Sequence, residues 1–222
     1  TRGMWIGTFH GLCNRLLRTH YREANLPQSF QILDSADQQS AIKRLLKSLN
    51  VDEEKFKPRE LAWFINSAKE QGLRANQVEA HDEFTIRQVE LYRAYDEQCQ
   101  KEGVVDFAEL LLRCYELLGR DENLRHHYGE RFRHILVDEM QDTNRLQFQW
   151  IRLLSQGGAA VFGVGDDDQS IYAFRGAEAA NMRDFQRDFA GKNVIKLEQN
   201  YRAHGAILEA ANAGIQHNKN RL

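Results

Sequence analysis

The stretch after residue 130 alternates short apolar runs with helical patterns, and this alternation restricts the fold more than any other feature of the chain. The apolar runs occupy residues 134–138, 160–164 and 194–197, and the helical patterns follow at about 144–155, at about 178–189 and from about 204. Strands that alternate with helices form parallel β-structure, because each parallel strand needs a crossover connection to the next. This part of the chain is therefore predicted to be α/β.

Ahead of residue 130 the pattern changes to a block of helices. The expected helices run from Asp34 to about Asn50, from Pro58 to just before Gly72, from about Phe84 to Glu102, and from Asp106 to Gly119. Asp and Pro favour helix starts, and Gly favours helix ends. No strand is predicted between residues 34 and 118, whereas residues 4–8 are predicted to form a short strand before a helix from about Gly11. Four aromatic residues at helical spacing are predicted to be core residues: Trp63, Phe64, Tyr92 and Tyr95.

The composition excludes some classes of protein. The chain has 30 Lys and Arg against 32 Asp and Glu, whereas a domain that holds nucleic acid by charge alone is usually strongly basic. The cysteines Cys13, Cys99 and Cys114 form no CxxC pair and are predicted to be reduced core thiols. No stretch approaches the roughly 18 apolar residues of a membrane span. Any nucleic-acid site should therefore be local, or should rely on stacking against aromatic rings.

Carboxylates follow two of the predicted strands directly. The first cluster is Asp138, Glu139 and Asp142, and the second is Asp166, Asp167 and Asp168. Ligands of open parallel sheets bind at the carboxyl ends of the strands, so both clusters are expected at one edge. Like charges this close are costly unless a cation lies among them, and Mg²⁺ with a bound phosphate chain fits that need. Solvated acidic turns are the alternative interpretation.

The residue types at these strand ends suggest individual roles in phosphate chemistry. Asp138 would support the metal, directly or through water. Glu139 would accept a proton from an attacking water. Gln169 offers an amide that could sense the terminal phosphate of a nucleotide.

Five strings resemble the motifs of one family and occur in that family's order. They are GTFHGL (7–12), VVDFAELLL (104–112), LVDEMQDTN (136–144), VGDDDQSIYAFRGA (164–177) and LEQNYR (197–202). Together they resemble the UvrD/Rep-like superfamily 1 DNA helicases, and the resemblance spans almost the whole chain. The implied fold is a partial RecA-like parallel sheet of the P-loop NTPase type with a large all-helical insert. The implied domains are a first motor domain (1–25 and 106–195), a helical insert (26–105) and the start of a second motor domain (196–222).

The resemblance also implies roles for individual residues. It assigns Mg²⁺ to Asp138, the catalytic base to Glu139, and coupling of the γ-phosphate to the DNA site to Gln169. Tyr201 would stack on the adenine of ATP, and Arg202 would reach its γ-phosphate. The implied contacts with single-stranded DNA are Thr8, Phe9, His10, Tyr172, Phe174 and Arg175.

The implied function is an ATP-dependent helicase that moves 3′→5′ on single-stranded DNA, in DNA repair or replication. Its expected partners are single-stranded DNA, junctions of single and double strands, and repair proteins, in the cytoplasm at the nucleoid and without a membrane. Two alternatives are a carboxylate–metal nuclease, which would need no phosphate-binding lysine, and a non-enzymatic DNA-binding adaptor.

The chain contains no G-x-x-x-x-G-K-[ST] stretch, the loop that cradles phosphates in P-loop NTPases. The sequence is therefore expected to be an internal piece of a longer helicase and to be inactive as an ATPase by itself. A sheet that lacks its P-loop strand would leave open edges, so the piece is also expected to self-associate.

Overall fold

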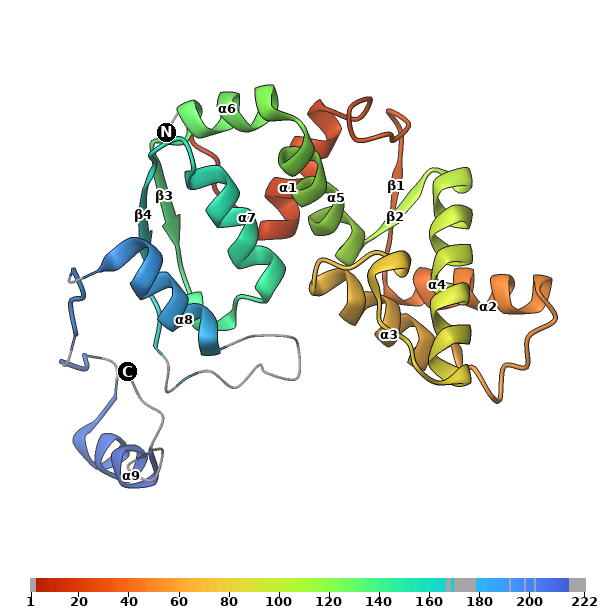
Figure 1. The fold of residues 1–222 in the computed structure, drawn as a ribbon. Helices are drawn as coiled ribbons and strands as arrows, with labels where there is room; N and C mark the ends of the chain where they lie inside the picture. Colours follow the sequence, from red (N-terminus) through yellow and green to blue (C-terminus); the bar gives the residue numbers. More distant parts are fainter. Residues whose placement is uncertain are drawn as a thin grey trace. The chain divides into compact units, whose positions relative to one another are not determined.

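The computed structural model describes residues 3–166, 169, 179–191, 193–197, 199–201 and 203–215. It contains helices and two small parallel sheets (Figure 1), so the predicted α/β class is confirmed. In chain order the elements are α1 (Phe9–Thr19), β1 (Gln31–Leu33), α2 (Ser35–Ser48), α3 (Pro58–Glu70), the 3-10 turn η1 (Ala75–Gln77), α4 (Glu83–Glu102), β2 (Val104–Asp106), α5 (Phe107–Arg120), α6 (Glu122–Arg131), β3 (His134–Val137), the 3-10 turn η2 (Met140–Asp142), α7 (Arg145–Ser155), β4 (Ala160–Gly163), α8 (Ala179–Phe185), the π-helical segment η5 (Gln186–Ala190) and α9 (Gly205–Ile215).

These elements form two compact units. The first comprises Thr1–Tyr128 with Arg145–Leu154, and the second comprises Gly129–Asn144 with Ser155–Leu222. The acidic strand ends, which are the candidate nucleotide-binding site, belong to the second unit. The segment GTFHGL (7–12) belongs to the first unit. Each unit is described by itself below.

Local chemistry sets the ends of the helices in the first unit as predicted. Asp34 caps α2, because its Oδ1 accepts hydrogen bonds from the backbone N of Ala36 and of Asp37, both at 2.8 Å. Pro58 is the first residue of α3, where its missing N–H costs nothing. Gly103 ends α4 with φ +67°, a left-handed conformation that favours glycine.

Three predictions about strands are wrong. Between residues 34 and 118, where no strand was predicted, β2 is present; it pairs in parallel with β1, which lies just before this stretch, with Gln31 opposite Val104 and Leu33 opposite Asp106. Each strand has only three residues, too few to show a period-two pattern. Residues 4–8 form no strand, since Thr8 already caps α1, and residues 193–197 form none within the described part of the chain.

One hydrophobic cluster holds the helical block of the first unit together. Most of its side chains come from α2, α3 and α4, with Phe56 and Ala75 from the connecting segments, and it includes Tyr92 and Tyr95, both buried as predicted. Trp63 contradicts the prediction, because it is 69% exposed. The buried face of α3 carries Leu61 and Ile65, and at 100° per residue Trp63 falls on the opposite face.

The second unit contains the predicted pair of neighbouring strands. β3 and β4 are parallel, in register from His134 opposite Ala160 to Val137 opposite Gly163, and α8 lies alongside them (Figure 1). Gly163 ends β4 against an aromatic ring: a Cβ at this position would lie 2.7 Å from Cζ of Phe185. The carboxyl ends of both strands therefore meet at one edge, as the sequence predicted.

All three cysteines are free and buried, which confirms their prediction as core thiols. Among the residues that the structure describes, no helix combines the length and the apolar character needed to cross a membrane.

Candidate functional site

The turn after β3 carries an unusual backbone conformation at the predicted catalytic base. Glu139 has φ +51° and ψ +49°, in the left-handed region that residues other than glycine rarely adopt. The carboxylate of Asp138 supports this turn, since its Oδ1 accepts a hydrogen bond from the backbone N of Glu139 at 3.0 Å. Both acidic side chains are exposed. Backbone strain that the surrounding structure maintains is common at functional sites.

A buried glutamine joins the two acidic strand ends. The amide Nε2 of Gln141 donates to Oε2 of Glu139 at 2.6 Å, and its Oε1 accepts from the backbone N of Asp166 at 3.1 Å. The backbone N of Met140 also donates to the carbonyl of Val164 at 2.9 Å. The structure therefore brings the two strand ends together, as the sequence predicted.

No role for Gln141 was predicted from the sequence. The signal available was its position between carboxylates in DEMQD, where an amide can donate to one group and accept from another. Its side chain is buried, so both of its polar atoms need partners, and the two strand ends supply them.

Gln169 belongs to the second strand end. Its Nε2 donates to Oδ2 of Asp166 at 2.7 Å, and its backbone N donates to the carbonyl of the same residue at 3.0 Å. The chain Glu139–Gln141–Asp166–Gln169 is thus linked by hydrogen bonds across both ends. Asp167 and Asp168 lie outside the described residues.

The floor of this site is closely packed and polar. The Thr143 hydroxyl donates to the carbonyl of Met140 at 2.7 Å, and Nδ2 of Asn181 donates to the carbonyl of Thr143 at 2.8 Å. Gly165 lies directly against Gln141, because a Cβ at this position would be 2.7 Å from Oε1 of Gln141 and 3.2 Å from Sδ of Met182. An added Cβ would therefore force the amide of Gln141 to shift, and this shift would disturb its hydrogen bonds to Glu139 and Asp166.

Substitution of Gly165 with alanine is therefore expected to destabilise the chain by about 1–3 kcal/mol, the usual cost of overpacking. Denaturant unfolding measures the change. Gly119→Ala is the matched control, because a Cβ on this helical glycine meets nothing within 4 Å. The control is expected to stabilise by roughly 0.5–1 kcal/mol. Equal unfolding midpoints for the two variants would contradict the packing described for Gly165.

The donor set at the acidic ends suits Mg²⁺ bound together with phosphate. Mg²⁺ usually takes one or two protein carboxylates and completes its shell with water and phosphate oxygens. Asp138 and Glu139 present exposed carboxylates, and the buried Oδ1 of Asp142 has no hydrogen-bond partner among the described atoms. The described residues bring no three His, Cys, Asp or Glu side chains together as a closed metal site. These residues fit a metal that arrives with its nucleotide.

The segment Thr8–Phe9–His10 begins α1 in the first unit. Oγ1 of Thr8 accepts a hydrogen bond from the backbone N of Gly11 at 3.2 Å and so caps the helix. The ring of Phe9 lies edge-on to Trp150, with 6.0 Å between the ring centroids. Burial lowers the pKa of His10 below its ordinary value, so its ring is neutral at pH 7.

A second aromatic side chain accompanies this segment. Phe107 is 49% exposed at the start of α5, and its ring lies edge-on to His10 with 6.0 Å between the centroids. No role for Phe107 was predicted from the sequence. The available signal was a large apolar residue directly after the helix-capping Asp106 in VVDFAELLL, a position outside the apolar stripe of the helix.

The remaining predicted site residues are only partly described. Tyr201 is 92% exposed in the second unit, as a ring free to stack on a base would be. Tyr172, Phe174, Arg175 and Arg202 lie outside the described residues.

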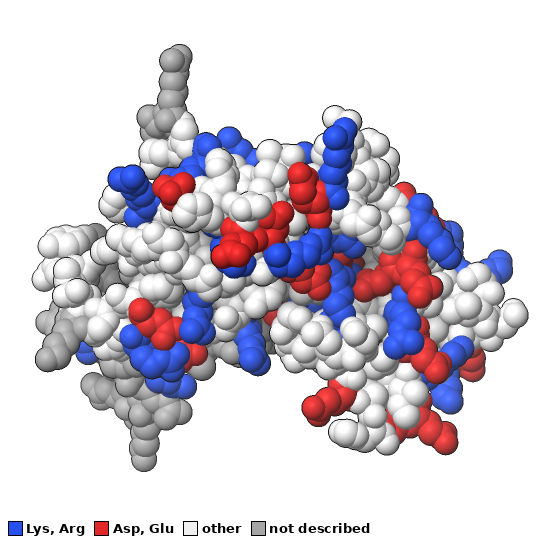
Figure 2. Space-filling view, turned by 45° about the horizontal axis from the view of Figure 1, so that its top comes forward, with Lys and Arg blue, Asp and Glu red and all other residues white. Residues whose placement is uncertain are grey.

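Charges of both signs are mixed on the surface. Figure 2 shows basic and acidic side chains of the described residues interspersed over the face that it presents. This arrangement agrees with the net charge of −2 and gives a bound polyanion no extended basic face there.

Comparison with known proteins decides the family. A family model described as the UvrD/REP helicase N-terminal domain matches residues 1–190. The chain belongs to the UvrD/REP helicase family. This assignment agrees with the mixed α/β fold, the parallel β3–β4 pair and the joined acidic strand ends, and it confirms the resemblance drawn from the motifs.

Curated relatives of this UvrD/REP chain carry helicase names. It is 53% identical over 223 residues to DNA helicase II of Salmonella typhimurium and 53% identical to DNA helicase II of Escherichia coli; each alignment covers 99% of this chain and 31% of the relative. It is 39% identical to the ATP-dependent DNA helicase PcrA of Bacillus subtilis, over 98% of this chain and 30% of the relative. The chain thus spans about a third of the length of these relatives.

Proposed function

We propose that this chain is part of an ATP-dependent DNA helicase that translocates 3′→5′ on single-stranded DNA, in DNA repair or replication. The observation that carries the proposal is the Gln141 bridge, which joins the strained Glu139 turn to the second acidic strand end. Such a linkage suits a site that must respond to a phosphate lying between the two ends. The names of the relatives support DNA as the substrate and ATP as the fuel.

The chemistry that we propose for the second unit is hydrolysis of ATP. Asp138 would hold Mg²⁺ directly or through water, and the ion would neutralise charge on the β- and γ-phosphates. Glu139 would accept the proton of the attacking water. Gln169 would sense the γ-phosphate, while Tyr201 would stack on the adenine and Arg202 would reach the γ-phosphate.

The DNA contacts that we propose begin with Thr8, Phe9 and His10, and the exposed ring of Phe107 extends them. Tyr172, Phe174 and Arg175 would complete the path. Aromatic rings stack on any base, so this contact needs neither sequence preference nor a high positive charge. Single strands and junctions between single and double strands are the proposed substrates, in the cytoplasm at the nucleoid.

We also propose that the chain acts within a longer protein, as residues of a first motor domain (1–25 and 106–195), a helical insert (26–105) and the start of a second motor domain (196–222). The 222 residues contain no phosphate-binding G-x-x-x-x-G-K-[ST] loop, and a P-loop NTPase needs that lysine to hold its phosphates.

The test is phosphate release from ATP by the longer protein, with and without single-stranded DNA. Strong stimulation by DNA is the expected result. The 222-residue chain, assayed alongside, is expected to release no phosphate above the background of buffer. Turnover by the chain alone that Glu139→Gln abolishes would refute the second expectation. If DNA is instead degraded in Mg²⁺ without ATP, the site is a nuclease and the proposal fails.

A further inference from the structure

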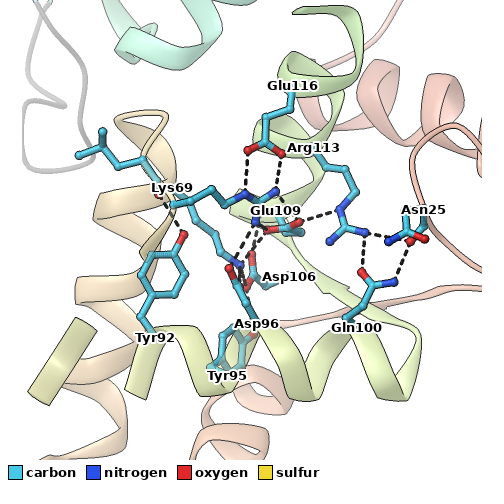
Figure 3. Close-up of polar contacts among 12 residues, drawn as sticks. Asn25, Lys69, Tyr92, Tyr95, Asp96, Gln100, Asp106, Glu109, Arg113 and Glu116 are labelled. Atoms are coloured by element: carbon cyan, nitrogen blue, oxygen red, sulfur yellow. Dashed lines mark hydrogen bonds and ion pairs between the residues drawn. The ribbon is translucent and has the colours of Figure 1, made fainter. Parts of the chain in front are cut away.

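A buried aspartate in the first unit connects three helices to the start of a fourth. Asp106 is 2% exposed and caps α5, since its Oδ1 accepts a hydrogen bond from the backbone N of Glu109 at 2.7 Å. Its other oxygen, Oδ2, accepts from Nζ of Lys69 at 2.9 Å, from the hydroxyl of Tyr95 at 3.0 Å and from Nε2 of Gln38 at 3.3 Å. These three donors come from α3, α4 and α2 (Figure 3 labels Lys69, Tyr95 and Asp106).

Capping alone does not require this arrangement. A helix N-cap needs one acceptor, which Asn or Ser supplies without charge. A buried carboxylate is costly unless it is neutralised and hydrogen-bonded, and Lys69, 1% exposed, neutralises this one. Burial by itself lowers the pKa of Lys69, but the neighbouring Asp106, Glu109 and Asp96 outweigh burial and hold the pKa well above its ordinary value. The contacts of Oδ2 therefore go beyond helix capping, because they connect Asp106 to α2, α3 and α4.

An arginine fixes α5 further along its length. Arg74 donates two hydrogen bonds to Glu109, at 2.7 and 2.9 Å, and two to Glu116, at 2.8 and 2.6 Å. Arg113 adds a hydrogen bond from its Nε to Glu109 at 2.7 Å. Paired donors that face paired acceptors set orientation as well as distance. The helical block thus holds α5 both at its first turn and two turns later.

The start of α5 lies beside the proposed DNA contacts. Phe107 directly follows Asp106, and its exposed ring meets His10 edge-on. Helices α1 and α5 pack against each other (Figure 1), and the 6.0 Å between the ring centroids of His10 and Phe107 shows that the two helix starts are neighbours. Any movement of the Asp106 backbone would displace Phe107 relative to His10.

We propose that Asp106 is a positioning residue for DNA binding: the donors Gln38, Lys69 and Tyr95 fix it, and it sets the place of Phe107 beside His10. The inference rests on the proposed function, since it assumes that this pair of rings contacts single-stranded DNA. Through these donors the helical block determines how well DNA is held, without touching it at this point.

Two tyrosines of α4 supply a matched pair of variants. Tyr95 donates to Asp106, whereas the equally buried Tyr92 donates to the carbonyl of Leu73 at 3.0 Å. Tyr95→Phe and Tyr92→Phe each remove one hydroxyl and keep the ring. In the longer protein, the measured quantities are the concentration of single-stranded DNA that half-maximally stimulates phosphate release and the rate at saturating DNA.

Tyr95→Phe is expected to raise the half-maximal DNA concentration about fivefold, the effect of one hydrogen bond, and to leave the rate at saturating DNA unchanged. Tyr92→Phe is expected to change neither quantity. In a Phe107→Ala background, Tyr95→Phe is expected to have no further effect, because both changes act through the same ring.

The outcomes separate the inference from the proposed function. Identical DNA dependence in the two tyrosine variants overturns the inference, as does an undiminished effect of Tyr95→Phe in the Phe107→Ala background. A wild-type protein without stimulation by DNA refutes the proposed function, and the inference with it. If Tyr95→Phe does not fold, Gln38→Met removes the longest contact to Asp106 and is expected to give a smaller rise; wild-type behaviour of that variant again overturns the inference.

Discussion

Replacing Lys69 with alanine is expected to lower the free energy of unfolding by about 3–5 kcal/mol, the range observed when one partner of a buried ion pair is removed. The ammonium group lies 2.9 Å from Oδ2 of Asp106, 3.0 Å from Oδ1 of Asp96 and 3.0 Å from Oε2 of Glu109. Without it, three carboxylates in and around the buried cluster lose their shared cation. Denaturant unfolding at neutral pH measures the loss.

Lys57→Ala is the control for this prediction. Lys57 pairs with Glu60 at 3.1 Å, but both side chains are more than half exposed, and such surface pairs contribute about 0–1 kcal/mol. A double variant tests the cause: Lys69→Met with Asp106→Asn keeps an N-cap and removes both buried charges of the pair, so the carboxylate of Asp106 is no longer left without its cation and part of the stability should be recovered. A loss for Lys69→Ala no larger than that for Lys57→Ala would contradict the buried-pair account.

The ion cluster of Lys69 with Asp96, Asp106 and Glu109 could not be predicted from the sequence. Lys69 and Asp106 are 37 residues apart, and charged residues are usually exposed, so a list of charges does not reveal which of them are buried together. One local signal was available. Lys69 lies four residues after Ile65 and eight after Leu61, on the apolar stripe of α3, where a polar residue needs a buried partner.

The same periodicity argument explains the error at Trp63. The helical spacing of the aromatic residues predicted that Trp63 is a core residue, but its angular position on α3 places it opposite Leu61 and Ile65. In contrast, helix ends depend on neighbouring residues only. Asp34, Pro58 and Gly103 therefore predicted their helices to within a residue or two.

The candidate nucleotide site was predictable for a different reason. Parallel strands bring their carboxyl ends to one edge, so Asp138, Glu139 and Gln169 could be placed together from two apolar runs and their acidic ends. The bridge through Gln141 could not be predicted, because it depends on side-chain geometry between those ends. The left-handed backbone conformation of Glu139 could not be predicted either, because glutamate has no preference for positive φ.

Glu139→Gln in the longer protein is expected to reduce DNA-stimulated phosphate release by about 10²–10⁴-fold, the usual contribution of a general base. The substitution keeps the shape of the side chain and removes its ability to accept a proton. The introduced amide would retain an oxygen that can accept the hydrogen bond that Gln141 now donates at 2.6 Å, so the bridge between the strand ends should persist. Nucleotide and DNA affinities are therefore expected to stay within about twofold of wild type, since Asp138, the residue proposed to hold Mg²⁺, is unchanged.

Glu79→Gln makes the same chemical change on an exposed side chain of the helical block and should leave phosphate release unchanged. The comparison separates proton transfer from general effects of charge, because both variants remove one negative charge from the chain. Near-wild-type phosphate release by Glu139→Gln would mean that another group accepts the proton. Asp142 would then be the candidate, because its buried Oδ1 has no hydrogen-bond partner among the described atoms and lies in the same acidic turn.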